Sequence, residues 1–150
     1  MHLIFNMMSL YFAGSYTEQI FSPSPVYIVF YLLALVFSAL PDFLKHKNNP
    51  YYASIGASGA VSAVLFSLVL FAPWGIVRIY FILPIYFILF AVLYLGFSYH
   101  MAQKQQDNIG HRAHLFGAIF GLIATMIYEP SSITYFMQTI LQPPFLSYFR

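Results

Sequence analysis

The sequence predicts an all-α membrane protein, a polytopic bundle of about five transmembrane helices. Of its 150 residues, 61% are hydrophobic and only 7% are charged, whereas a soluble domain has roughly a quarter of its residues charged. The few charged side chains could not cover a water-exposed surface, so lipid is the expected solvent. Because one bilayer crossing takes about 20 apolar residues, or somewhat fewer at the short end, the chain has room for about five spans.

Turn-forming and polar segments divide the chain into five apolar runs. Serine and proline residues at 22–25 favour extended or turn backbone after the first run. Pro41 and Asp42 are expected to stop the second run and to begin a charged, solvent-facing connection. In chain order, the expected apolar runs are 3–17, 26–40, a third that starts at 54–56 and ends at 72, 79–99, and 113–128.

These runs predict one transmembrane domain over residues 1–130. The fourth run is the most aromatic and is expected to be a lipid-facing helix, with Pro84 as a kink. Residues 131–150 carry aromatic side chains and two adjacent prolines. We expect this segment to form an interfacial C-terminal tail.

Composition excludes several classes of function. The net charge is +2 and the basic residues are scattered, so the sequence gives no support for nucleic-acid binding. With no cysteine in the chain, a thiolate nucleophile and a cysteine metal site are ruled out. We expect no cofactor and no metal, and the sequence leaves the oligomeric state open.

Unusual polar residues stand at the starts of alternate runs. If five spans cross in alternation, the starts of the first, third and fifth lie on one membrane face. They carry His2 and Asn6, Ser58, and His114 respectively. Each of these residues alone is explained by a hydrogen bond to the backbone of its own or a neighbouring helix. Four at one depth favour a functional site, because buried polar groups in lipid are costly.

Ser58 and its neighbours fit the requirements of a serine hydrolase. Such a site needs a base within hydrogen-bond reach of the hydroxyl and donors aimed at the developing oxyanion. Ser58 is expected near a helix start, where free N–H groups and the positive end of the helix dipole would meet that oxyanion. Gly56 and Gly59 flank it and allow close approach of a substrate backbone. The G-x-S-G pattern alone is weak.

Small residues predict that the third and fifth helices pack closely. Ala113, Gly117 and Gly121 recur at a spacing of four, which permits close contact between helices in lipid. A comparable stripe on the third helix is formed by Gly56, Ala60, Ala63 and Ser67. Close packing would bring Ser58 and His114 within reach. Ordinary structural packing explains the stripes equally well, but it does not explain a serine and a histidine at level ends.

Taken together, these motifs resemble the rhomboid family of intramembrane serine proteases. The resemblance covers nearly the whole chain, in the family's order. It implies a Ser-His dyad without a third carboxylate, acting on transmembrane protein substrates in the lipid bilayer. The matching motifs are G-x-S-G at Gly56 to Gly59, Ala113-His114 followed by Gly117 and Gly121, and H-x-x-x-N at His2 to Asn6.

The resemblance also implies a role for each residue. Ser58 would be the nucleophile and His114 the general base and acid. Asn6, His2 and the Ser58 backbone N–H would form the oxyanion hole. By the same comparison, a multi-pass protein of the bacterial inner membrane is expected. The four glycines would support the motifs: Gly56, Gly59, Gly117 and Gly121.

The chain departs from the family's pattern in two places. The first helix of the family, which precedes the H-x-x-x-N motif, is expected to be missing. Ser62 stands one turn after the nucleophile, where the family often has an aromatic residue that stacks on the imidazole. We expect Tyr52 or the first helix to support His114 instead. His111 is expected to be a solvent-facing or capping residue at the rim.

Two other functions remain open from the sequence. A catalytically inactive rhomboid-like membrane scaffold, or a truncated fragment, would keep the fold without cleaving. A small transporter or channel component could instead use His111 and His114 to relay protons or bind a metal. We expect neither to account for the motifs as well as a protease does.

Overall fold

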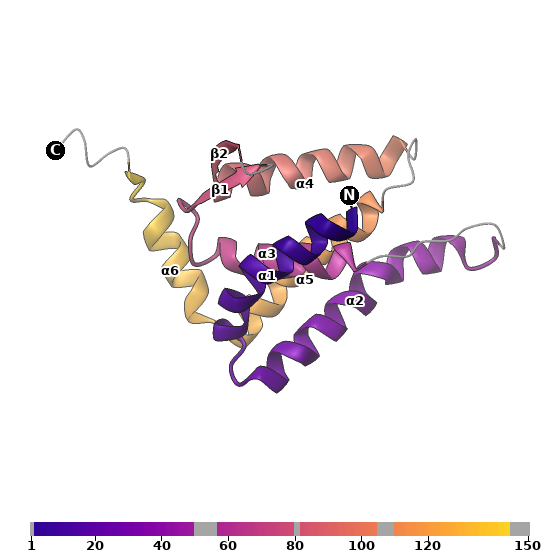
Figure 1. Ribbon diagram of the computed structural model, residues 1–150, viewed down its shortest axis with the longest axis horizontal. Coiled ribbons are helices and arrows are strands. Elements are labelled where there is room, and N and C mark those ends of the chain that lie inside the picture. Colours follow the sequence, from indigo (N-terminus) through magenta and orange to yellow (C-terminus); the bar gives the residue numbers. More distant parts are fainter. Residues whose placement is uncertain (1, 50–56, 80–81, 105–109, 145–150) are drawn as a thin grey trace.

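A computed structural model describes residues 2–49, 57–79, 82–104 and 110–144, and for His2 the helical backbone only. The described residues form six helices and one two-stranded hairpin (Figure 1). Most of the chain is therefore helical, as the sequence predicts. The elements are α1 His2–Ile20, α2 Ser24–His46, α3 Ser58–Val69, β1 Ile76–Ile79, β2 Leu83–Tyr86, α4 Phe87–Lys104, α5 His111–Tyr128 and α6 Ser131–Ile140.

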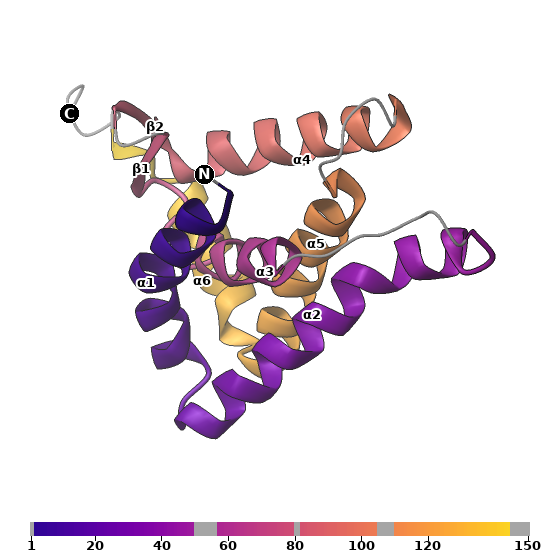
Figure 2. The same ribbon diagram turned by 45° about the vertical axis from the view of Figure 1, so that its right-hand side comes forward.

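Helix α3 is the centre of the bundle. It packs against α1, α2, α4 and α5, and its interface with α5 is the most extensive in the molecule. In Figure 2 the other helices surround it, with α2 and α4 on opposite sides. One apolar cluster joins α1 and α2 to α3 around Phe30 and Val64, and another joins α3 to α4 and α5 around Phe66. The short, small-residue helix is thus the element that positions its neighbours.

Helices α1 to α5 alternate in direction. Thr17, near the end of α1, donates a hydrogen bond to Val64 O at 3.0 Å in the second half of α3, so these two helices run the same way. Near the end of α2, Asp42 pairs with Arg112 at the start of α5 at 3.4 Å, so those two run in opposite directions. The starts of α1, α3 and α5 therefore lie toward one end of the bundle, as expected from the polar residues that they carry.

The expectation of one continuous helix over residues 79–99 was wrong. Strands β1 and β2 pair as an antiparallel hairpin in which Arg78 lies opposite Pro84, and α4 begins only at Phe87. Proline has no N–H to donate and disfavours a helical residue before it. β-Branched Ile76, Val77 and Ile79 favour strands, so the hairpin satisfies both preferences.

The expectation that the second helix stops at Pro41 was also wrong. Helix α2 continues through Pro41 to His46, which places Asp42 inside the helix. Its side chain is 8% exposed and is paired with Arg112. Asp42 was expected in a solvent-facing connection, whereas it lies in a contact between helices.

The C-terminal segment is partly helical. Helix α6 follows α5 at an angle of 113°, and the Trp74 ring N–H donates to Thr139 O at 2.9 Å, which ties α6 to the chain before the hairpin. Figure 1 shows α6 at the edge of the bundle, beyond the end of α5. Its location at a membrane interface stays a prediction.

Within the described residues, only α2 is by itself long and apolar enough to cross a membrane. Helices α5 and α6 meet the same requirement when they are taken together as one bent span. The count of five spans is therefore not confirmed. Large apolar side chains nevertheless face outward on several helices, among them Leu3, Val36, Val92 and Ile127. Such an exterior suits a lipid environment better than water.

Candidate active site

A serine and a histidine from two different helices meet at one end of the bundle. His114 Nε2 lies 2.8 Å from Ser58 Oγ. Ser58 is the first residue of α3 and His114 lies in the first turn of α5. Both side chains are partly buried, so neither is sealed from solvent. A proton can pass between the hydroxyl and the imidazole at this distance.

Glycines allow α3 and α5 to approach to backbone contact. A Cβ at Gly117 would overlap the backbone of Gly59, and one at Gly121 would overlap the backbone of Ala63. A Cβ at Gly59 would lie 3.0 Å from Ala113 O and would overlap the Ser38 side chain of α2. These three glycines therefore set the helix separation that places Ser58 beside His114, whereas Gly56 lies outside the described residues.

The small-residue stripe on α3 was assigned only partly correctly. Gly59 and Ala63 face α5, but Ser67 lies 3.2 Å from the Thr17 hydroxyl of α1. Helix α3 is central, so its small residues serve two interfaces. The sequence pattern could not separate them.

Asn6 lies close to the start of α3. It lines a cavity of about 150 Å³ together with Ala57, which precedes the nucleophile candidate, and Val61. The first intrahelical bond of α3 runs from Val61 N–H to Ala57 O at 3.0 Å, so the N–H groups of the preceding helical residues lie at the open helix end. His2 is the first residue of α1, but its side chain lies outside the described part of the chain.

An aromatic residue that the sequence analysis missed stacks on the imidazole. The Tyr94 ring of α4 lies 6.1 Å from the His114 ring, centroid to centroid, at an interplanar angle of 25°. Its hydroxyl is 2.6 Å from Ser62 Oγ. Tyr52, one of the supports expected from the sequence, lies outside the described residues. Ser62 was the one feature of the sequence that could have indicated this contact. A serine at that position has no ring to stack on the imidazole, so an aromatic residue from another helix can do so.

His111 is not a solvent-facing residue. It is 6% exposed and its ring packs against Phe97 of α4 at 5.5 Å. It also contacts His114, with ring centroids 6.0 Å apart. The expectation of a solvent-facing rim residue was wrong because α4 covers the first turn of α5.

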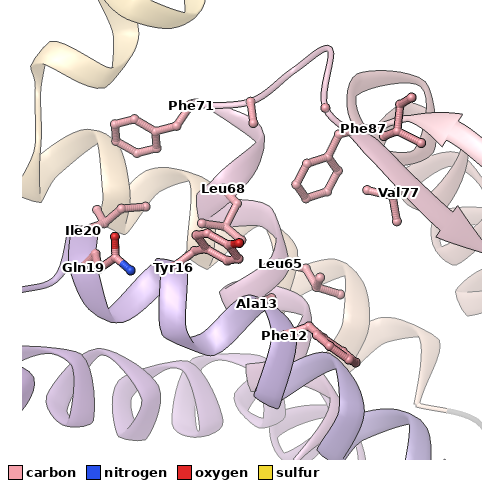
Figure 3. A pocket seen from close by; sticks show the side chains of 13 residues that line it. Phe12, Ala13, Tyr16, Gln19, Ile20, Leu65, Leu68, Phe71, Val77 and Phe87 are labelled. Atoms are coloured by element: carbon pink, nitrogen blue, oxygen red, sulfur yellow. The ribbon is translucent and has the colours of Figure 1, made fainter.

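A larger apolar cavity lies away from this pair (Figure 3). Its volume is about 740 Å³, and its lining includes Phe12 and Tyr16 of α1, Leu65 and Leu68 of α3, and Phe87. These residues belong to the second halves of α1 and α3 or follow the hairpin. The cavity is thus toward the end of the bundle opposite Ser58, and neither Ser58 nor His114 lines it.

Five helices of alternating direction, with a hydrogen-bonded serine and histidine at one end, define a helical membrane-protein bundle. Sequence comparison specifies the family: the Rhomboid domain matches residues 1–131. The chain therefore belongs to the rhomboid family and is a membrane protein.

A curated relative agrees with this family. RHOMBOID-like protein 12, mitochondrial, of Arabidopsis thaliana is 27% identical over 139 residues, which cover 82% of this chain and 41% of the relative. The chain thus spans less than half the length of that relative. The mitochondrial description gives no support to the bacterial inner membrane expected from the sequence. No solved structure matches the chain significantly.

Proposed function

We propose that the chain is an intramembrane serine endopeptidase that cleaves transmembrane segments of other membrane proteins. The observation that carries the proposal is the 2.8 Å contact between His114 Nε2 and Ser58 Oγ at the start of α3. Serine hydroxyls are weak nucleophiles and react only when a base lies within hydrogen-bond reach. Membership of the rhomboid family supports this assignment.

In the proposed reaction, Ser58 Oγ attacks the scissile carbonyl carbon while its proton passes to His114 Nε2. For this step Nε2 must be unprotonated, so the ring proton sits on Nδ1. The tetrahedral intermediate collapses, the C–N bond breaks, and His114 returns the proton to the leaving amine. Water then attacks the acyl carbon while His114 takes its proton, the bond from that carbon to Ser58 Oγ breaks, and His114 returns the proton to Oγ.

The start of α3 supports stabilisation of the oxyanion. The Ser58 backbone N–H belongs to the first turn, where amide donors lack helical acceptors and the helix dipole is positive. Asn6 borders the same region through the cavity that it shares with Ala57. We assign the oxyanion hole to the Ser58 N–H, the Asn6 side chain and His2.

The membrane arrangement forms part of the proposal. Helices α1 to α5 each cross the bilayer, with the ends that carry Ser58 and His114 near one surface. Water reaches the pair from that surface, because both residues are partly exposed. A substrate segment must unwind there to present its carbonyl, since a peptide bond within a helix is shielded.

The direct test is cleavage of a transmembrane substrate by the purified chain in liposomes. A small library of single-span substrates with helix-weakening residues near one surface supplies the candidates. We expect cleavage by the wild-type chain and by Ser15→Ala and His100→Ala, which alter exposed residues on α1 and α4. Ser58→Ala and His114→Ala should each lose activity by at least about a thousandfold.

Two outcomes would reject the proposal. Equal cleavage by Ser58→Ala would show that another group is the nucleophile. A folded wild-type chain that binds substrates but cleaves none of them would instead indicate an inactive rhomboid-like scaffold.

A further inference from the structure

Ser62 connects Tyr94 to the backbone of the nucleophile candidate. The Ser62 hydroxyl donates to Ser58 O at 3.0 Å. A hydroxyl has one proton to donate, so the Tyr94 hydroxyl is the donor in the 2.6 Å contact with Ser62 Oγ. The Tyr94 ring then covers one face of His114. The first turn of α3 therefore holds both partners: His114 contacts Ser58 at its start, and Tyr94 contacts Ser62 at its end.

Aromatic residues of α4 contact both histidines at the start of α5. Tyr94 stacks on His114, and Phe97, one turn further along α4, packs edge-on against His111. Helix α4 contacts α3 less extensively than it contacts α5, and Tyr94 reaches α3 through its hydrogen bond to Ser62 and its ring contact with Phe66. The orientation of the imidazole thus depends on where α4 lies.

We propose that Tyr94 is the positioning residue for His114, and that Ser62 fixes Tyr94 in place. This inference rests on the proposed protease function. The second side-chain torsion of histidine is broad, and the hydrogen bond at Nε2 holds one edge of the ring. A ring anchored to α3 and stacked on the imidazole restricts this torsion.

Three substitutions separate the ring from its hydroxyl. Tyr94→Leu removes the stacking ring, and Tyr94→Phe and Ser62→Ala each remove the bond that anchors it. We expect kcat to fall about tenfold to a hundredfold in Tyr94→Leu, because small misplacement of a catalytic group has effects of this size. Tyr94→Phe and Ser62→Ala should each lose about threefold to tenfold in kcat, and their double variant should lose no more than either alone.

Controls distinguish positioning from general destabilisation. KM should stay within about twofold in all of these variants, because Tyr94 is not assigned any contact with substrate. Tyr99→Leu makes the same substitution at a ring of α4 that is 59% exposed, and it should leave kcat unchanged. Full kcat in Tyr94→Leu, or parallel losses in Tyr99→Leu and Tyr94→Leu, would overturn the inference.

A second readout does not depend on turnover. Nuclear magnetic resonance of 15N-labelled histidine in the full chain reports ring mobility at His114, assigned by comparison with His114→Gln. We expect the His114 signal to shift and broaden in Tyr94→Leu but not in Tyr99→Leu. An inactive wild-type chain that shows this change would reject the protease proposal and keep the positioning role, whereas an unchanged signal would reject the positioning role.

Discussion

Single residues matter at this site because its chemistry depends on contacts between helices. Ser58 and His114 are 56 residues apart and meet at 2.8 Å. Each lies in the first turn of its helix, where the helix dipole favours negative charge. The helix starts that would stabilise an oxyanion therefore also carry the serine and the histidine.

Asn6 provides a prediction about the oxyanion hole. Asn6→Ala should lower kcat about a hundredfold to a thousandfold, the usual effect of removing one oxyanion donor, with little change in the melting temperature. The measurement is the cleavage rate in liposomes. Gln19→Ala is the matched control, because it removes an amide from the same helix beside the distant apolar cavity. An Asn6→Ala chain with the wild-type rate would exclude Asn6 from the oxyanion hole.

The sequence predicted the contact between Ser58 and His114 but not the support of the imidazole. Motif spacing and helix alternation were sufficient to place both residues at one end. Tyr94 gave no comparable signal, because it lies in an apolar run with many aromatic residues and its role depends on the rotation of α4 about its axis. Rotation is set by packing against α3 and α5, which periodicity alone does not specify.

At the scale of helices, the backbone contact between α3 and α5 is the critical interface. Gly117→Ala would force a Cβ into the Gly59 backbone, so we expect a loss of about 1–3 kcal/mol in the free energy of unfolding and a loss of activity. Gly96→Ala is the matched control, because a Cβ there meets open space among the described residues. Thermal unfolding in detergent should show a lower melting temperature for Gly117→Ala only, and equal melting temperatures would contradict the close packing.

Asp42 and Arg112 join α2 to the start of α5. Asp42 is almost fully buried while the Arg112 side chain is 22% exposed, so removing the arginine leaves a buried carboxylate without this partner. We expect the double variant Asp42→Ala/Arg112→Ala to be less destabilised than the sum of the single variants, with a coupling of about 1–3 kcal/mol. Chemical denaturation of the four proteins measures it. Strict additivity would mean that the pair contributes nothing to stability.

The elements themselves were only partly predictable. Two segments were assigned wrongly: the hairpin, and the last turns of α2. Each of them contains a proline within or beside an apolar run. A short apolar run cannot be assigned to strand or helix by periodicity alone. Pro41 is tolerated inside α2, whereas Pro84 lies in a strand, and local sequence does not distinguish these two outcomes.

At the scale of the whole molecule, the alternation of α1 to α5 predicts a defined topology. The chain has no cysteine, so single cysteines can report sidedness without background. In sealed vesicles, Lys47→Cys and Lys104→Cys should react with an impermeant maleimide from one side. Ser22→Cys and Ser131→Cys should react only from the other, since these four exposed positions lie at opposite ends of the helices. Labelling of all four from one side would contradict five crossings.

The proposed protease requires that His114 activates Ser58 for nucleophilic attack. The most direct measurement is labelling of the detergent-purified full chain with a fluorophosphonate, which reacts when an activated serine displaces fluoride from phosphorus. Mass spectrometry should locate the adduct on Ser58, and labelling should be lost in both Ser58→Ala and His114→Ala but kept in His100→Ala. A folded chain that stays unlabelled, or equal labelling in His114→Ala, would show that His114 does not activate Ser58.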